Sequence, residues 1–138
     1  MSAHRPLQPP AGGMLPPPTV TLADGTQLDL RPLARKISEA HFARHPDELQ
    51  HYGEAGLEWC THDNQHLLQW AALDLAGSVD FDEQLRWLTR VLTARGYPIE
   101  NLADNLRAGE SVLKGQSNRE SVHALAERLA VAAESLSA

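Results

Sequence analysis

The sequence predicts one all-α domain, and three observations carry that prediction. The chain has 138 residues, a length typical of a single domain. From residue 32 onward, apolar residues recur every three or four positions, which is the period of a helix that buries one face. Proline, glycine and capping residues divide this region into five segments joined by short connections, as in other helical domains.

The first 31 residues are expected to form a flexible tail and a β-hairpin. Six of the nine prolines fall within residues 1–18, where they oppose both helix propagation and central strand pairing. Residues 19–30 alternate in polarity on both sides of Asp24-Gly25, a dipeptide favoured in tight hairpin turns. We therefore assign residues 1–31 to the tail and hairpin, and residues 32–138 to the helical domain.

The first two helices are delimited by prolines. Pro32 suits a first helical turn, and the segment that it opens is expected to end before Pro46. A long second helix is expected over residues 47–75, with a kink near Gly53 and Gly56.

The last three helices are marked by caps and breakers. Each starts with a side chain that accepts a backbone N–H, or with proline, and two of them end at glycine. The markers in chain order are Asp80 with Glu83, Gly96, Pro98, Gly115, and Ser117 with Glu120.

Composition excludes several classes of function. The formal net charge is −6, from 12 basic and 18 acidic residues, whereas nucleic-acid binding needs clustered Lys and Arg. No apolar run approaches the ~20 residues of a membrane span. The single cysteine, Cys60, excludes an internal disulfide and a multi-thiolate zinc site. These features predict a cytoplasmic protein.

The candidate chemistry lies on the second predicted helix. At about 100° per residue, Cys60 falls within the apolar stripe and Asp63 at its edge. Trp59, His66 and Trp70 are neighbours of Asp63 on the same side. A carboxylate half-buried among indoles requires hydrogen-bond donors or a cation. This arrangement favours a flat, apolar ligand that carries N–H groups.

Purely structural interpretations of the same residues stay open. A lone Cys on an apolar helical face, such as Cys60, is usually a small core residue. An Asp at the edge of such a face, such as Asp63, often pairs with an arginine of another helix, here Arg86 or Arg90.

Metal binding and catalysis receive little support from the sequence. His62 and His66 lie one turn apart, but no acidic or Cys partner joins them on that face. Cys60 with a distant His41 or His123 has neither an oxyanion hole nor a third orienting group to complete a nucleophilic site. We therefore predict no metal site and no enzymatic activity.

Several short motifs together resemble the phycobiliproteins. That family has Cys-x-Arg-Asp on its chromophore helix, followed by Leu and by an Ala-Gly pair at the helix end. The motifs that carry the resemblance here are Cys60-Thr61-His62-Asp63, Leu68, Leu75-Ala76-Gly77, Phe81-Asp82-Glu83-Gln84-Leu85, Ala133-Glu134-Ser135-Leu136-Ser137 and Ile37-Ser38-Glu39-Ala40 before Pro46. The resemblance covers residues 32–138 and implies a globin-like fold.

The resemblance implies roles for individual residues. Cys60 would form the thioether to a linear tetrapyrrole, and Asp63 would accept hydrogen bonds from the pyrrole nitrogens. His62 stands at the family's arginine position, so propionate binding would be weaker there or would pass to Arg86 or Arg90.

The remaining expected pocket residues also follow from the resemblance. Gln84 replaces a tyrosine that borders the chromophore, and His66 and Leu67 stand where aromatic residues are common. Trp59 and Trp70, which the helical periodicity places beside Asp63, would complete the pocket. The front of the chain lacks the helical pair with which antenna phycobiliproteins grip their partner, so the small bilin biosynthesis-associated globins are the better analogy.

The sequence therefore predicts a non-enzymatic protein that binds a bilin of the biliverdin or phycocyanobilin type, as carrier, sensor or accessory of bilin metabolism. One alternative is a haem-binding globin with His66 or His62 as axial ligand. Another is a ligand-free helical interaction module whose tryptophans are core or interface. The expected partner is the tetrapyrrole, without nucleic acid or membrane, and a homodimer is compatible with this prediction.

Overall fold

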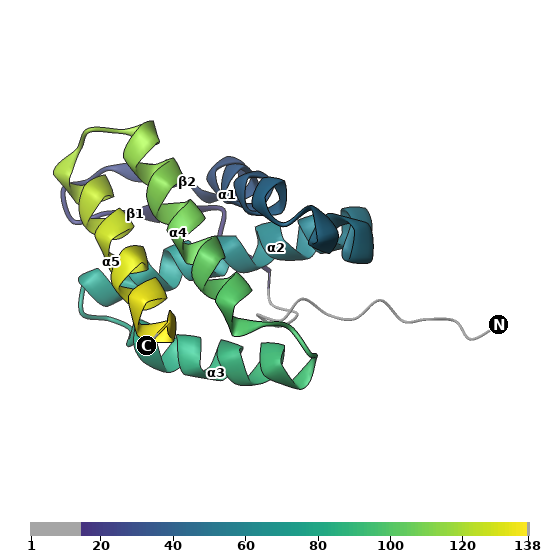
Figure 1. Ribbon diagram of the computed structural model, residues 1–138. Helices are drawn as coiled ribbons and strands as arrows, with labels where there is room; N and C mark the ends of the chain where they lie inside the picture. Colours follow the sequence, from purple (N-terminus) through teal and green to yellow (C-terminus); the bar gives the residue numbers. More distant parts are fainter. Residues whose placement is uncertain (1–14, 138) are drawn as a thin grey trace.

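Five α-helices and a two-stranded antiparallel hairpin make up the fold (Figure 1). The computed structural model describes residues 15–137. The elements in chain order are β1 (Thr19–Thr21), β2 (Gln27–Asp29), α1 (Leu30–Arg44), α2 (Pro46–Leu75), α3 (Phe81–Ala94), α4 (Ile99–Gln116) and α5 (Glu120–Ser137). The mostly helical architecture expected from the sequence is confirmed. Within the described residues, no helix combines the length and apolar character needed to cross a membrane.

The helices pack mainly as two pairs. α4 lies along α5, α1 packs on α2, and α1 also contacts α4 (Figure 1). Side chains from all five helices and from the hairpin form one apolar core. Its largest fully buried apolar side chains are Leu30, Ile37, Leu68, Phe81, Leu88, Leu106, Leu113, Val122, Leu125 and Leu129. Most of them occupy the helical periodicity that predicted the fold.

The hairpin belongs to this packed unit. β1 and β2 pair in the register Val20 with Leu28, and Val20 is part of the core. α1 begins at Leu30, so the boundary predicted between residues 31 and 32 falls within this helix. Leu30 is fully buried, and the helix begins two residues before Pro32, which lies in its first turn as expected.

The predicted flexible tail ends earlier than expected. The carbonyl of Pro18 accepts a hydrogen bond from the N–H of Leu30 at 2.9 Å. The carbonyl of Pro17 accepts one from Nε2 of Gln65 at 3.1 Å. Residues 17 and 18 are therefore fastened to the helical domain, and residues 1–14 of the predicted tail lie outside the described residues.

The predicted kink in α2 lies at Gly53. This residue has φ 65° and ψ −156°, a backbone conformation that favours glycine. Three residues later, a side chain at Gly56 would collide with Tyr52. The two glycines thus redirect the first turns of α2, which carry Glu48 and Tyr52, relative to the turns that carry Cys60.

The capping predictions are confirmed for α3 and differ at the α4–α5 junction. Oδ1 of Asp80 accepts the N–H of Glu83 at 3.1 Å, and Gly96 follows α3 with φ 78°. α4 continues through Gly115 to Gln116, so the prediction that Gly115 ends the helix is wrong. Ser117 accepts the N–H of Arg119 in a tighter turn than the predicted box with Glu120.

One ion-pair cluster ties three helices together. Arg128 of α5 pairs with Asp74 of α2 at 3.1 Å and with Asp82 of α3 at 3.0 Å. Its guanidinium also lies over the ring of Phe81, with Cζ 5.0 Å from the ring centroid. Hydrogen bonds from Arg128 and from the N–H of Phe81 hold the pKa of Asp74 below its usual value.

We expect Asp74→Asn to lower the free energy of unfolding at pH 7 by about 1–2 kcal/mol. This value lies between the losses that are typical of exposed ion pairs and those of buried ion pairs. Because the native pKa of Asp74 is depressed, its stabilisation is present above the unfolded pKa, ~3.9, and is lost as pH falls through the native value. Urea denaturation of both proteins from pH 7 to pH 3 checks this. A constant difference across that range would contradict it.

Candidate functional site

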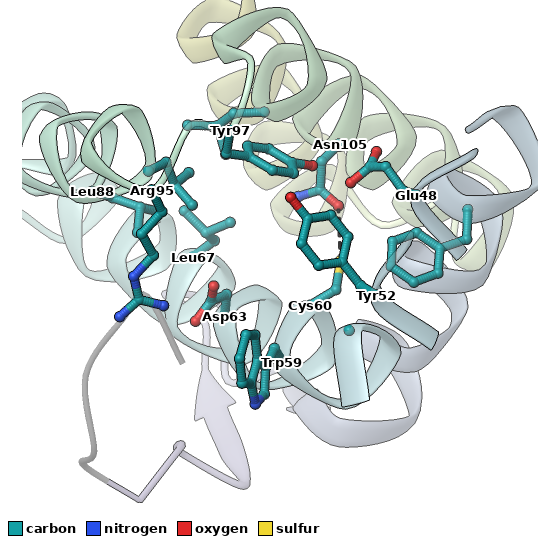
Figure 2. A pocket seen from close by; sticks show the side chains of 14 residues that line it. Glu48, Tyr52, Trp59, Cys60, Asp63, Leu67, Leu88, Arg95, Tyr97 and Asn105 are labelled. Carbon is teal, nitrogen blue, oxygen red and sulfur yellow. Dashed lines mark hydrogen bonds between the residues drawn. The ribbon is translucent and has the colours of Figure 1, made fainter. Parts of the chain in front are cut away.

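A cavity of about 160 Å³ lies between α2, α3 and α4 and is open on one side. Figure 2 shows side chains from these elements pointing toward this common space. Its apolar lining consists of Phe42, Gly56, Trp59, Leu67, Leu88, Leu92 and Leu102. Its polar lining consists of Glu48, Tyr52, Cys60, Asp63, Arg95, Tyr97 and Asn105. An apolar enclosure with a few polar groups is the usual form of a small-molecule site.

Cys60 lines the cavity and is held by two amides. Its Sγ accepts a hydrogen bond from Nδ2 of Asn64 at 3.5 Å and donates to Oδ1 of Asn105 at 3.6 Å. Burial raises the pKa of the Cys60 thiol to about 12. The thiol is therefore protonated at neutral pH and is not a ready thiolate nucleophile.

Hydrogen bonds with Asn105 explain why a polar residue, Asn64, lies on the apolar face of α2. Asn64 falls in the apolar sector of α2 and is 3% exposed. Its Nδ2 donates to Oγ of Ser38 and to Oδ1 of Asn105, and its Oδ1 accepts from Nδ2 of Asn105 at 2.8 Å. This amide pair joins α2 to α4 behind the thiol.

Asp63 lies beside Trp59, Cys60 and Leu67 in the cavity wall (Figure 2). Its side chain is 14% exposed, and Oδ1 lies 3.5 Å from Nδ1 of His62. Asp63 is therefore a carboxylate mostly removed from water at the edge of an apolar surface, as the periodicity predicted. Arg86 and Arg90, the expected ion-pair partners, are exposed on α3, and the arginine of the cavity wall is Arg95.

The other predicted pocket residues lie outside the lining. His66 is buried, His62 is partly buried, and their rings are 4.9 Å apart. Trp70 packs near His66 at 5.7 Å between centroids and against the core. Gln84 and Arg86 are on α3 but not at the cavity. The structure thus brings together Trp59, Cys60, Asp63 and Leu67 of the nine predicted residues.

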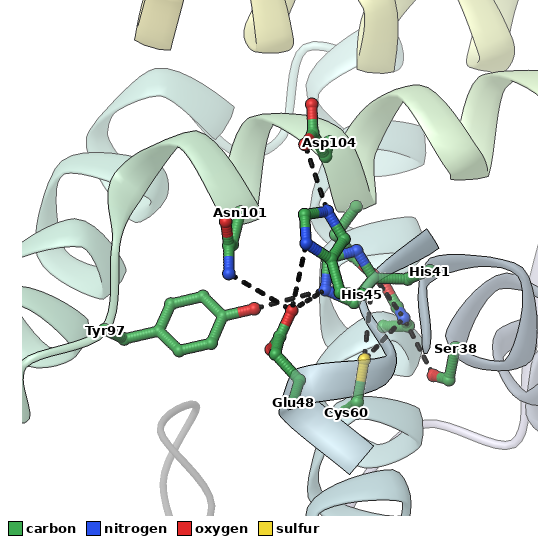
Figure 3. A network of polar contacts seen from close by, with 10 residues as sticks. Ser38, His41, His45, Glu48, Cys60, Tyr97, Asn101 and Asp104 are labelled. Atoms are coloured by element: carbon green, nitrogen blue, oxygen red, sulfur yellow. Dashed lines mark hydrogen bonds and ion pairs between the residues drawn. The ribbon is translucent and has the colours of Figure 1, made fainter. Parts of the chain in front are cut away.

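A buried polar network borders the cavity at Glu48 (Figure 3). Oε2 of Glu48 lies 2.6 Å from Nε2 of His41 and accepts from Nδ2 of Asn101 at 3.2 Å. The hydroxyl of Tyr97 lies 3.3 Å from the same His41 nitrogen. Burial and the nearby Glu48 carboxylate raise the pKa of Tyr97, so its phenol remains protonated and able to donate.

The sequence contained signals for part of this network. His41, His45 and Glu48 follow one another at spacings of four and three across the break between two predicted helices. Arg95 and Tyr97 flank the predicted terminator Gly96. Their meeting with α2 depends on how α3 and α4 fold back, which no local pattern specifies.

The site can bind a small molecule by three kinds of contact. Leucine and aromatic side chains offer apolar burial, Asp63 and Glu48 accept hydrogen bonds, and the guanidinium of Arg95 favours an anionic group. No protein-family model, curated protein or solved structure matches this chain.

Proposed function

We propose that this protein binds a linear tetrapyrrole, a bilin, in the cavity between α2, α3 and α4, without catalysing a reaction on it. The observation that carries the proposal is the shared cavity wall of Trp59, Cys60 and Asp63. A thiol, a carboxylate largely removed from water and a flat indole offer a bilin an attachment point, an acceptor for its N–H groups and a stacking surface. The resemblance to phycobiliproteins and their globin-like fold is part of the same proposal.

The size of the cavity limits how the ligand sits. An apolar cavity of about 150 Å³ holds a molecule of the size of benzene, and the cavity here measures about 160 Å³. One pyrrole ring would therefore fit inside, with the rest of the bilin outside the cavity. Asp63 would accept hydrogen bonds from pyrrole N–H groups, and Arg95 would hold a propionate.

A covalent link to Cys60 requires loss of the thiol proton when sulfur adds to an unsaturated A-ring substituent. The proton is transferred to the substituent, so the addition is balanced without an oxidant or reductant. The raised pKa of Cys60 makes this reaction slow. We propose that non-covalent binding precedes any thioether, so that pigment is first held by Asp63 and the apolar wall.

Haem is the weaker candidate for this cavity. An axial ligand must project into the haem pocket, and the described residues that line this cavity include no histidine. The predicted axial ligands His62 and His66 are outside the lining.

The test is Asp63→Asn, which removes the charge at nearly constant volume. We expect bilin affinity to fall by about 10- to 150-fold, corresponding to about 1.5–3 kcal/mol for a hydrogen bond to a charged group. The red band of protonated pigment should also weaken at neutral pH. Absorbance titration with biliverdin measures both effects.

Two controls separate ligand binding from folding. Glu134→Gln removes an exposed carboxylate of α5 and should leave the titration unchanged. Cys60→Ala should retain reversible binding, while any pigment that survives denaturation of the wild type should be lost. If Asp63→Asn lowers the melting temperature but leaves affinity and spectrum unchanged, Asp63 is a structural residue and the proposal fails.

A further inference from the structure

We propose that His41, His45 and Glu48 form a binding site for one divalent transition-metal ion, and that zinc is the ion whose preferences they fit best. One possible ligand atom from each of the three lies within 4.8 Å of the others. Two imidazole nitrogens and one carboxylate oxygen form a set that zinc accepts, whereas calcium and magnesium prefer oxygen ligands.

The junction between α1 and α2 holds the three residues in place. The N–H of His45 donates to the carbonyl of His41, and the N–H of Glu48 donates to the carbonyl of His45, both at 3.0 Å. His41 is fully buried and Glu48 is 5% exposed. A site that is fixed by the backbone before the ion arrives needs little ordering when it binds.

The distances between the possible ligand atoms are close to those in a tetrahedral zinc site. Oε2 of Glu48 is 2.6 Å from Nε2 of His41 and 3.9 Å from Nδ1 of His45. Tetrahedral zinc with bonds of about 2.0–2.1 Å separates its ligand atoms by roughly 3.3 Å. The shorter distance must therefore widen and the longer one narrow, each by less than about 1 Å, which side-chain rotation provides.

His45 also has the outer partner typical of a metal-bound histidine. Its other ring nitrogen, Nε2, lies 3.1 Å from Oδ2 of Asp104 on α4 (Figure 3). A carboxylate on the distal nitrogen fixes the tautomer that leaves the near nitrogen bare for the metal. Asn101, which also lies on α4, donates to Glu48 at 3.2 Å and orients that carboxylate.

The site adjoins the cavity because Glu48 contributes to both. Three protein ligands leave a fourth zinc position for water or for a ligand atom. The metal proposal does not rest on the proposed bilin function, since two of its three ligands, His41 and His45, do not line the cavity.

The experiment is a zinc titration of untagged, pigment-free protein from which metal has first been removed with a chelator. A chromophoric chelator competes for the zinc and reports the affinity. We expect one zinc per chain. Asp104→Asn, which removes an outer partner, should weaken zinc affinity by roughly 10- to 100-fold. His45→Ala and Glu48→Gln each remove a ligand and should weaken zinc affinity by more than Asp104→Asn does. His51→Ala, an exposed histidine of α2, is the matched control and should bind as the wild type does.

A second readout guards against variants that do not fold. Stoichiometric cobalt should give a visible d–d spectrum in the wild type, in His51→Ala and in Asp104→Asn, with circular dichroism confirming the helices. Absence of stoichiometric zinc binding by the wild type, or equal affinity of folded His45→Ala and wild type, would show that the three residues form a hydrogen-bond network only.

Discussion

Phe81→Ala is expected to lower the free energy of unfolding by about 3–5 kcal/mol, the usual cost of deleting a buried phenylalanine. Phe81 is fully buried at the start of α3. Its N–H donates to Oδ2 of Asp74 at 2.9 Å, and its ring receives the guanidinium of Arg128. The residue thus fixes α3, which supplies Leu88 and Leu92 to the cavity.

Equilibrium denaturation in urea measures this loss. Val131→Ala is the control, because Val131 is 60% exposed on α5 and surface substitutions usually change stability by less than about 0.5 kcal/mol. A loss below about 1 kcal/mol for Phe81→Ala would mean that the α3 start repacks freely, against the anchoring role assigned to this ring.

Asn64→Ala is expected to cost about 2–3 kcal/mol, because it leaves polar atoms of Asn105 buried without their partners. Asn64 and Asn105 exchange hydrogen bonds at 2.8 and 3.2 Å, and Asn105 is 5% exposed. Loss of these hydrogen bonds should also weaken the packing of α4, which carries Asn105, on α2, which carries Asn64 and Cys60.

A double variant isolates the cause of that loss. When both partners of a buried hydrogen bond become apolar, the cost is small, so Asn64→Leu with Asn105→Leu should be no less stable than Asn64→Ala. Urea denaturation of Asn64→Leu, Asn105→Leu and the double variant gives the comparison. If the losses of the two single leucine variants simply add in the double variant, the pair does not act as a unit.

Local chemistry explains which parts of the fold were predictable. Asp80, Gly53 and Gly96 act through their own backbone and nearest neighbours, so their caps and the kink follow from sequence. Pro32 lies in the first turn of α1 as expected, and the helix starts two residues earlier, at Leu30, whose burial among distant residues no local pattern shows. Likewise, Asn64 looked anomalous because its partner Asn105 lies 41 positions away.

The candidate site also has a part that the sequence predicts and a part that only the packing of the helices decides. Trp59, Cys60, Asp63 and Leu67 share one helical stretch, and their periodicity placed them together. His66 and Trp70 are close to them on that helix but turn to the core and to each other. Around the helix axis His66 and Trp70 each fall within about 20° of Trp59, so their position farther along α2, and not their angle, separates them from the cavity wall, and the packing of α3 and α4 sets that division. The same packing brings in Arg95, Tyr97 and Asn105.

Absorbance titration of the full chain with biliverdin tests whether the cavity between α2, α3 and α4 binds a bilin. Leu92→Trp is the comparison, because a larger side chain at this lining position occupies the space meant for a pyrrole ring. We expect the wild type to saturate at one bilin per chain with a stronger red band, and Leu92→Trp to lose that binding while remaining helical. Equal titration curves for the two proteins, or no saturable change with the wild type, would contradict the claim.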